Sequence, residues 1–312
     1  MQVRPWYGCD GRSCLYKQPT PLVTDRVVQD IVSISTTDGS RFLSPVSVAR
    51  VTFSCAGDKN LQGLPPPVVG VLALSLGSSS FPRQVTSAIG ISSYFSLCLP
   101  SSGTGTGHFY IATPNYLIPP FNGSDSPRIM TDLKFVNSEY LPYVTSIYVG
   151  GVLLSLSPNL LEGGAKLSTV VPYTVLHTNI YNAHAQSFTV KAKTMGISKV
   201  QAIAPFKDCF DARAVGMDPT GLSVPVIEIG VPAVVTDAKW TFYGANTVVK
   251  VTETVMCLAF LDGGKNPKDL MVVGTHQLQD YMLEFDFSRY TLAFGVSLLL
   301  RNTSCSTWPS QK

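Results

Sequence analysis

Peptide-bond hydrolysis by paired carboxylates needs two aspartates that share a proton, each presented at a tight Asp-Thr-Gly or Asp-Ser-Gly turn. Neither tripeptide occurs in the 312 residues of this chain. The dipeptide Asp-Gly does occur, at residues 10–11, 38–39 and 262–263, where it is an ordinary turn signal. The sequence therefore predicts a protein without carboxylate-pair chemistry.

The histidines do not group into a recognisable catalytic or metal site. No pair of the four has the His-Glu-x-x-His spacing, and none flanks a Gly-x-Ser-x-Gly elbow. We interpret His184, on the apolar face of an expected helix, as a hydrogen-bonded core side chain, and we expect His276 to line a loop. These patterns predict no cofactor, no metal ion and no enzyme activity.

The cysteines are scattered along the chain, at positions 9, 14, 55, 98, 209, 257 and 305. Metal sites usually show paired close spacings, and only Cys9 and Cys14 are near neighbours. Scattered cysteines favour disulfides in an oxidising compartment. The odd count implies a free thiol, an intermolecular bridge or a missing part of the chain. The sequons at Asn122 and Asn302 are glycosylation candidates if the protein is secreted.

Charge and hydropathy argue against two classes of partner. Only 14% of the residues are charged, the net charge is +3, and no stretch gathers five or six Lys or Arg. We therefore expect no nucleic-acid binding. No apolar run approaches the length of a membrane span, so we expect the chain to contain no such span. The residues after Met1 also lack the apolar segment of a signal peptide.

Alternation of apolar and polar residues with a period of two dominates the chain and predicts short strands. Two helices are expected, at Pro82–Ile89 and at His177–Met195, the second with a cap-like start at Thr178-Asn179. The pattern indicates an all-β barrel or sandwich into which one long helix is inserted. The expected strands are 27–35, 48–55, 94–99, 108–112, 144–154, 224–231, 240–243, 247–251, 255–260, 271–274, 282–286 and 291–295.

A set of short stretches, in a fixed order over nearly the whole chain, carries a family resemblance. They are 51–55 (VTFSC), 70–74 (GVLAL), 81–84 (FPRQ), 95–100 (FSLCLP), 147–151 (IYVGG), 272–274 (VVG), 277–280 (QLQD), 285–286 (FD) and 293–295 (AFG). Together they resemble the plant pepsin-like inhibitor family, which includes wheat-type xylanase inhibitors, extracellular dermal glycoprotein, related xyloglucanase inhibitors and basic 7S globulin. The resemblance implies an all-β, pepsin-like bilobal aspartic-protease fold. Residues 1–135 would form a partial N-terminal lobe and residues 136–312 the C-terminal lobe.

The most specific stretch is GAKLSTVVPYT, at residues 164–174. In active relatives the second Asp-Thr-Gly turn lies here, and Ser168, Thr169 and Val170 stand in its place. A serine cannot share a proton with a carboxylate or act as the base that activates water. The resemblance places the other catalytic loop ahead of Met1. We therefore expect an incomplete N-terminal lobe and a catalytically inactive homologue.

The resemblance implies binding instead of catalysis, namely inhibition of microbial cell-wall glycosidases by an extracellular plant-defence protein. The partner would be an endoxylanase or a xyloglucan endoglucanase. Such enzymes use two carboxylates, which a guanidinium can engage. The stretch LLLRNTSC, at residues 298–305, is similar to the family's terminal inhibitory segment. Arg301, the adjacent Asn302 and, near a second inhibitory loop, Arg213 are therefore contact candidates.

The same resemblance implies a disulfide between Cys209 and Cys257, and it leaves the partners of the other cysteines open. It also leaves two other functions open. One is a storage or peptide-binding protein of the basic-globulin type, which would hold a peptide in the pepsin cleft. The other, least favoured, is a residual aspartic endopeptidase.

Overall fold

The computed structural model of the chain describes residues 13–15, 26–38, 42–54, 70–75, 77–101, 105–112, 117–118, 121–122, 128–136, 139–233 and 238–306. The chain divides into two compact units. The first comprises residues 1–94 and 111–113, and the second comprises residues 95–110 and 114–312. The boundary at 135/136 that the resemblance implies stays a prediction, and the two units are described separately below.

The first unit contains an antiparallel sheet of order β1-β2-β3 and one helix among its described residues. Its elements are β1 (Ser13–Leu15), β2 (Arg26–Thr37), β3 (Phe42–Ser54) and α1 (Phe81–Ile89). Val85 of α1 packs with Val48 and Val51 of β3. Gln84 fixes the helix to the same strand, because its side chain accepts from the backbone nitrogen of Thr52 at 2.7 Å and donates to its carbonyl at 2.9 Å.

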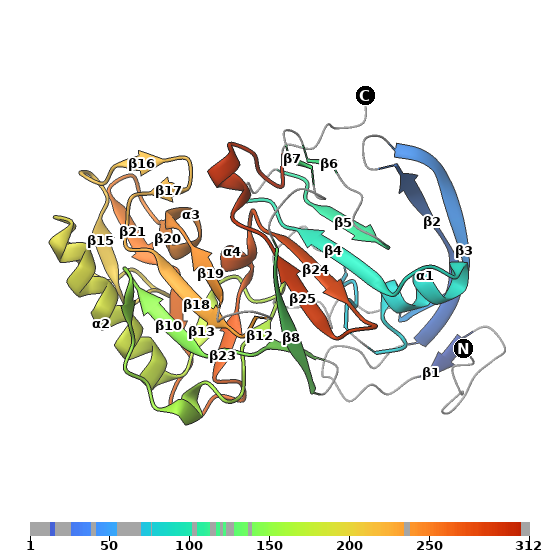
Figure 1. The fold of residues 1–312 in the computed structure, drawn as a ribbon, viewed down its shortest axis with the longest axis horizontal. Helices are drawn as coiled ribbons and strands as arrows, with labels where there is room; N and C mark the ends of the chain where they lie inside the picture. Colours follow the sequence, from blue (N-terminus) through green and yellow to red (C-terminus); the bar gives the residue numbers. More distant parts are fainter. Residues whose placement is uncertain are drawn as a thin grey trace. The chain divides into compact units, whose positions relative to one another are not determined.

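The described part of the second unit contains several small sheets and one larger sheet of order β5-β4-β24-β25-β8-β9 (Figure 1). The strands of the larger sheet are β4 (Tyr94–Cys98), β5 (His108–Ile111), β8 (Ile129–Val136), β9 (Glu139–Pro142), β24 (Met282–Asp286) and β25 (Thr291–Phe294). Its neighbouring strands come from both ends of the unit's sequence, so the order could not be read from local pattern. Phe95 of β4 stacks on Phe285 of β24 with ring centroids 4.6 Å apart, which places apolar core at this junction.

The remaining sheets of the second unit have the orders β11-β10-β18-β19, β12-β23-β13-β22, β14-β15-β21-β20, β16-β17 and β6-β7. Their strands are β6 (Leu117–Ile118), β7 (Phe121–Asn122), β10 (Ser146–Val149), β11 (Val152–Leu153), β12 (Lys166–Leu167), β13 (Thr174–Leu176), β14 (Lys199–Val200), β15 (Cys209–Asp211), β16 (Met217–Asp218), β17 (Gly221–Leu222), β18 (Ile227–Val231), β19 (Ala238–Phe242), β20 (Val248–Lys250), β21 (Val255–Leu258), β22 (Phe260–Asp262) and β23 (Met271–Val273). The helical elements are η3 (Pro158–Leu160), α2 (Thr178–Thr194), α3 (Gly244–Thr247), α4 (Thr275–Leu278) and η4 (Leu298–Arg301).

Helix α2 is the long helix that the sequence predicted, and it lies along one flank of the second unit, beside β10 (Figure 1). Its buried face consists of Ile180, Tyr181, His184, Ala185, Phe188 and Ala192, at the spacing expected of an amphipathic helix. The cap differs from the expected Thr178-Asn179 start. His177 is the N-cap residue, and its Nδ1 accepts from the backbone nitrogen of Asn179 at 3.1 Å.

Candidate functional site

The turn that contains Ser168 begins where strand β12 ends. The backbone nitrogen of Ser168 donates to the carbonyl of Val273 at 3.0 Å and so continues the parallel pairing of β12 with β23. The Ser168 Oγ then accepts from the backbone nitrogens of Val170, at 3.3 Å, and Val171, at 3.2 Å. Local bonds of this kind are how serine stabilises a turn. The hydroxyl therefore acts as the acceptor that shapes this loop.

The far side of the turn is held by the start of α4. The carbonyl of Val171 accepts from the backbone nitrogen of Thr275 at 2.8 Å and from its hydroxyl at 3.2 Å. Gly274 allows this approach, since a Cβ there would lie 2.4 Å from the carbonyl carbon of Tyr173. The chain then enters β13, which pairs antiparallel with β23 and parallel with β22. The turn is thus supported from strands on both sides.

A buried amide lies beneath this turn. Gln277 accepts from the backbone nitrogen and the hydroxyl of Thr174, and its Nε2 donates to the carbonyls of Asn246 at 2.8 Å and Ala259 at 2.9 Å. Gln277 and Thr174 are both buried. All the polar atoms of the Gln277 side chain are therefore engaged, which favours one arrangement of the loop.

The chemistry that this turn can perform is limited by what its side chains offer. Ser168 is half-buried, whereas Thr169 is exposed and Val170 is 53% exposed. The charged side chains before it are engaged in ion pairs, with Lys166 Nζ at 2.6 Å from Glu139 and 3.7 Å from Asp269. Burial alone would raise the pKa of Glu139, but the ammonium groups of Lys166 and Lys268 lower it. Among the described residues, no cluster of three or more His, Cys, Asp or Glu could hold a metal ion.

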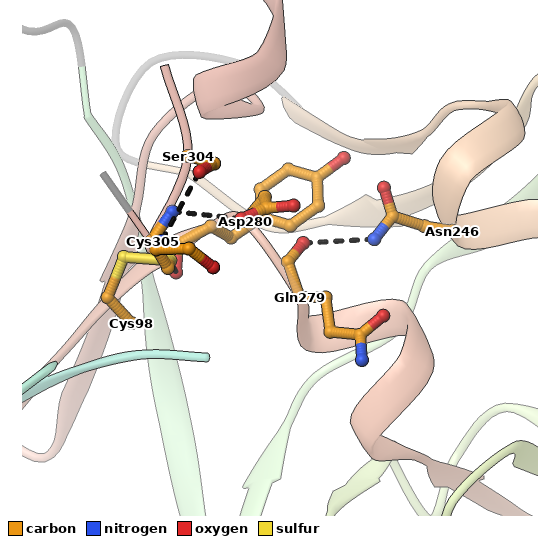
Figure 2. The surroundings of a disulfide bond; sticks show 8 residues. Cys98, Asn246, Gln279, Asp280, Ser304 and Cys305 are labelled. Carbon is orange, nitrogen blue, oxygen red and sulfur yellow. Dashed lines mark hydrogen bonds between the residues drawn. A yellow bond between two sulfur atoms is a disulfide. The ribbon is translucent and has the colours of Figure 1, made fainter. Parts of the chain in front are cut away.

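The second predicted feature, Arg301, lies in a loop at residues 298–305 that starts with the helical turn η4. Arg301 and Asn302 are both exposed, and Asn302 ends the turn in the left-handed conformation, with φ of 52°. Thr303 and Cys305 are buried. A disulfide joins Cys305 to Cys98, the last residue of β4, across 207 positions of sequence. This loop therefore has an exposed tip and a buried end, which the disulfide of Figure 2 ties to Cys98.

Arg213 lies in the turn that follows β15, and its guanidinium engages a carboxylate of its own chain. Its Nε lies 3.0 and 3.1 Å from the two oxygens of Asp211. This hydrogen-bonded guanidinium lowers the pKa of Asp211 to about 2. Arg213 is thus held in an ion pair close to the β16–β17 hairpin, whose Met217 is exposed.

The structure pairs Cys209 with Cys257, which stand directly opposite each other on β15 and β21. The sequence alone left the partners of Cys98 and Cys305 open, because no local signal connects residues so far apart. Cys9 and Cys55 lie outside the described residues. Cys14 and Asn122 are described only as backbone positions of β1 and β7.

Two of the histidines, His184 and His276, differ from what we expected. His276 belongs to α4 instead of a loop, and its Nε2 lies 3.1 Å from the carbonyl of Val248. His184 is 1% exposed and packs on the ring of Phe260, with centroids 4.4 Å apart. Within the described part of the chain, neither of its ring nitrogens has a hydrogen-bond partner, so the expectation of a hydrogen-bonded side chain was wrong. Burial lowers the pKa of His184 to about 3.

The small sheets, the flanking helix and the serine turn at the end of β12 define a pepsin-like β protein, and comparison with solved structures agrees. The crystal structure of edgp is similar with a TM-score of 0.90 and 31% identity, covering 99% of this chain and 80% of that one. The chain matches the family models described as xylanase inhibitor N-terminal, over residues 3–111, and xylanase inhibitor C-terminal, over residues 139–296. It belongs to this xylanase-inhibitor family, and the predicted family and pepsin-like fold are confirmed.

Two curated relatives show how varied the names in this family are. Gamma conglutin 1 of Prunus dulcis is 34% identical over 319 residues, covering 98% of this chain and 72% of the relative. Probable aspartic proteinase GIP2 of Nicotiana benthamiana is 30% identical over 328 residues, covering 97% of this chain and 74% of the relative. Family membership alone therefore does not decide between binding and catalysis. No helix in the described part of the chain has the length and apolar character of a membrane span.

Proposed function

We propose that this chain is a non-proteolytic pepsin-like protein that binds and inhibits a microbial cell-wall glycosidase, an endoxylanase or a xyloglucan endoglucanase, outside the plant cell. The observation that carries the non-proteolytic part is the Ser168 turn. Ser168 has no carboxylate with which a catalytic aspartate could share a proton, and its hydroxyl accepts from the backbone of Val170 and Val171. The side chains of Ser168, Thr169 and Val170 in this turn offer no group that can act as a base and activate water.

The inhibitory part rests on the loop 298–305. At its tip, Arg301 is an exposed residue on a short turn, between Leu300, which is 46% exposed, and Asn302. The paired carboxylates of a glycosidase lie a few ångströms apart, and a guanidinium matches one of them bidentately. Arg213 is the second contact candidate, and it would exchange its ion pair with Asp211 for a carboxylate of the partner.

Inhibition of a purified family-11 fungal xylanase and a family-12 xyloglucanase tests the proposal. We expect micromolar protein to lower the activity of at least one of the two enzymes. Arg301→Ala should weaken inhibition at least tenfold, whereas Arg289→Ala, an exposed arginine on the β24–β25 hairpin, should not. Full hydrolase activity at micromolar protein would refute the inhibitor function. Equal inhibition by Arg301→Ala would refute the residue assignment.

The absence of proteolysis is tested with the parent chain. Cleavage of casein at acid pH would overturn the non-proteolytic part of the proposal.

A glycan on Asn302 would put a bulky group beside Arg301, so Asn302→Gln made in a glycosylating host should inhibit at least as well as the parent chain. Weaker inhibition by Asn302→Gln would instead indicate that Asn302 itself contacts the partner.

A second candidate, a storage or peptide-binding globulin, is favoured by the relative named as a conglutin. Assays of hydrolase activity and of peptide binding distinguish this second function from glycosidase inhibition. A storage protein would leave both hydrolases fully active, and a peptide-binding protein would show saturable binding of peptides that an Arg301→Ala change does not alter.

A further inference from the structure

The loop 298–305 has both of its ends held by one residue, Asp280. The backbone nitrogen of Leu298, at the start of the loop, donates to the Asp280 carbonyl at 2.9 Å. The backbone nitrogen of Cys305, at its end, donates to the Asp280 Oδ1 at 2.9 Å, as Figure 2 shows. Between them, the backbone nitrogen of Thr303 donates back to the carbonyl of Leu298 at 3.3 Å. The loop is therefore closed at its base.

Asp280 is itself fixed to strand β4. Its backbone nitrogen donates to the carbonyl of Leu99 at 2.9 Å, and Leu99 follows Cys98, the disulfide partner of Cys305. The neighbouring Gln279 carbonyl accepts from the Asn246 side chain at 2.9 Å (Figure 2). One fully buried residue thus connects β4 with both ends of the loop.

Position 280 requires a residue that tolerates the left-handed backbone conformation and carries a hydrogen-bond acceptor. Its φ is 57°, a left-handed conformation that costs energy for residues other than glycine, least for Asn and Asp. Burial raises the pKa of the carboxyl, although hydrogen bonds from Ser101 and Cys305 oppose that shift. Packing alone would be served as well by a small apolar side chain or a glycine. What those residues lack is the acceptor for the Cys305 amide.

We propose that Asp280 is a positioning residue, whose carboxylate clamps the loop 298–305 so that Arg301 is presented in a preformed turn. This inference rests on the proposed inhibitory function for its consequence, and on the contacts of Asp280 for its structure. A preformed loop binds without losing the freedom that a mobile one would lose on binding. A partner with a narrow acidic cleft therefore meets Arg301 and the exposed Leu300 already in place.

Two substitutions separate the carboxylate from the backbone contacts of Asp280. Asp280→Gly removes the side chain, yet glycine adopts the left-handed conformation readily, so the bonds to Leu99 and Leu298 should persist. Asp280→Asn keeps an oxygen that can accept from the Cys305 amide and also tolerates this conformation. If the glycine variant does not fold, Asp280→Ser serves in its place, because its hydroxyl is too short to keep the same bond.

Hydrogen exchange tests the clamp without any hydrolase. We expect Asp280→Gly to speed exchange at Thr303 and Cys305 at least tenfold while leaving strand β24 unchanged, and Asp280→Asn to exchange as the parent chain does. Unchanged protection of residues 298–305 in Asp280→Gly would overturn the clamp.

Inhibition assays test what the clamp is for. Asp280→Gly should inhibit at least tenfold less well than the parent chain, and Asp280→Asn should restore inhibition. A loop that exchanges faster in Asp280→Gly with no change in inhibition would overturn the positioning role. If the parent chain inhibits neither enzyme, the proposed function and this role for Asp280 both fail, while the exchange result still decides whether the clamp exists.

Discussion

Gln277 accepts two hydrogen bonds from Thr174 through one side-chain oxygen, at 2.9 Å from the backbone nitrogen and 2.7 Å from the hydroxyl. The two residues are 103 positions apart and both are buried. The other end of Gln277 donates to the carbonyls of Ala259 and Asn246. This side chain therefore connects the strand after the Ser168 turn with α3 and with the residue between β21 and β22. The geometry of the turn thus depends on a residue far from it in sequence.

Replacing Gln277 by methionine should destabilise the second unit by about 3 kcal/mol or more, because it leaves the buried Thr174 amide and two carbonyls without partners. Gln186→Met, on the exposed side of α2, is the matched control and should change stability by less than about 0.5 kcal/mol. Urea denaturation of both variants measures the difference. Equal stabilities would mean that the Gln277 network is not what holds the turn.

Replacing Ser168 by alanine should cost about 1 kcal/mol, because the backbone amides of Val170 and Val171 lose their shared acceptor. The exposed neighbour Thr169→Ala is the control. Ser168→Asp should keep the stability of the parent chain, because a carboxylate oxygen can accept from the same amides. It should still not cleave casein at acid pH, since one carboxylate does not make a pair. Proteolysis by Ser168→Asp would show that a second carboxylate is present.

Removing the Cys98–Cys305 disulfide should cost about 1 kcal/mol more than removing Cys209–Cys257. In the chain-entropy model the stabilisation grows with the logarithm of the number of residues enclosed, and the separations are 207 and 48. Both pairs are fully buried, so serine substitution of each pair is a fair comparison. Equilibrium denaturation of the two double-serine variants gives the difference. A larger loss from the Cys209–Cys257 pair would contradict the entropic argument.

His184 should make the second unit less stable in acid. Its pKa is about 3 in the folded chain and 6.5 in its ordinary state, so the unfolded chain binds a proton that the folded chain excludes between these values. Stability from this residue is therefore complete above about pH 6.5. It falls by up to about 1.4 kcal/mol per pH unit as the pH drops towards 3.

The matched variant for this prediction is His184→Leu, which fills a similar volume beside Phe260 without titrating. Denaturation curves between pH 7 and pH 4 should show a steeper loss for the parent chain than for His184→Leu. Other groups, such as the low-pKa carboxylates of Asp262 and Asp211, titrate equally in both and cancel in the difference. Parallel curves would show that His184 stays neutral in the unfolded chain as well, or is not buried.

The periodicity of the sequence predicted both longer helices and the strands β2–β5, β10, β11, β18–β21 and β23–β25, whereas short strands such as β9, β13 and β15 were not expected. Helix α2 runs over Thr178–Thr194, against the expected His177–Met195, and helix α1 begins one residue before the expected Pro82. These agreements arise because the side-chain period of a strand or helix can be recognised from a few consecutive residues. The replacement of the Asp-Thr-Gly turn by Ser168, Thr169 and Val170 is instead what the family resemblance implies, and it stays a prediction.

Only the tertiary structure decided which residues far apart in sequence contact each other. Folding pairs Cys98 with Cys305, and it brings Asp280 to both ends of the loop 298–305. It also buries His184 against Phe260, where neither ring nitrogen has a hydrogen-bond partner among the described residues. The sequence by itself determined the fold class and the family, and it predicted a serine turn in place of the catalytic Asp-Thr-Gly turn. The folded chain decided how the Arg301 loop is held, because contacts between residues far apart in sequence leave no periodic signal to read.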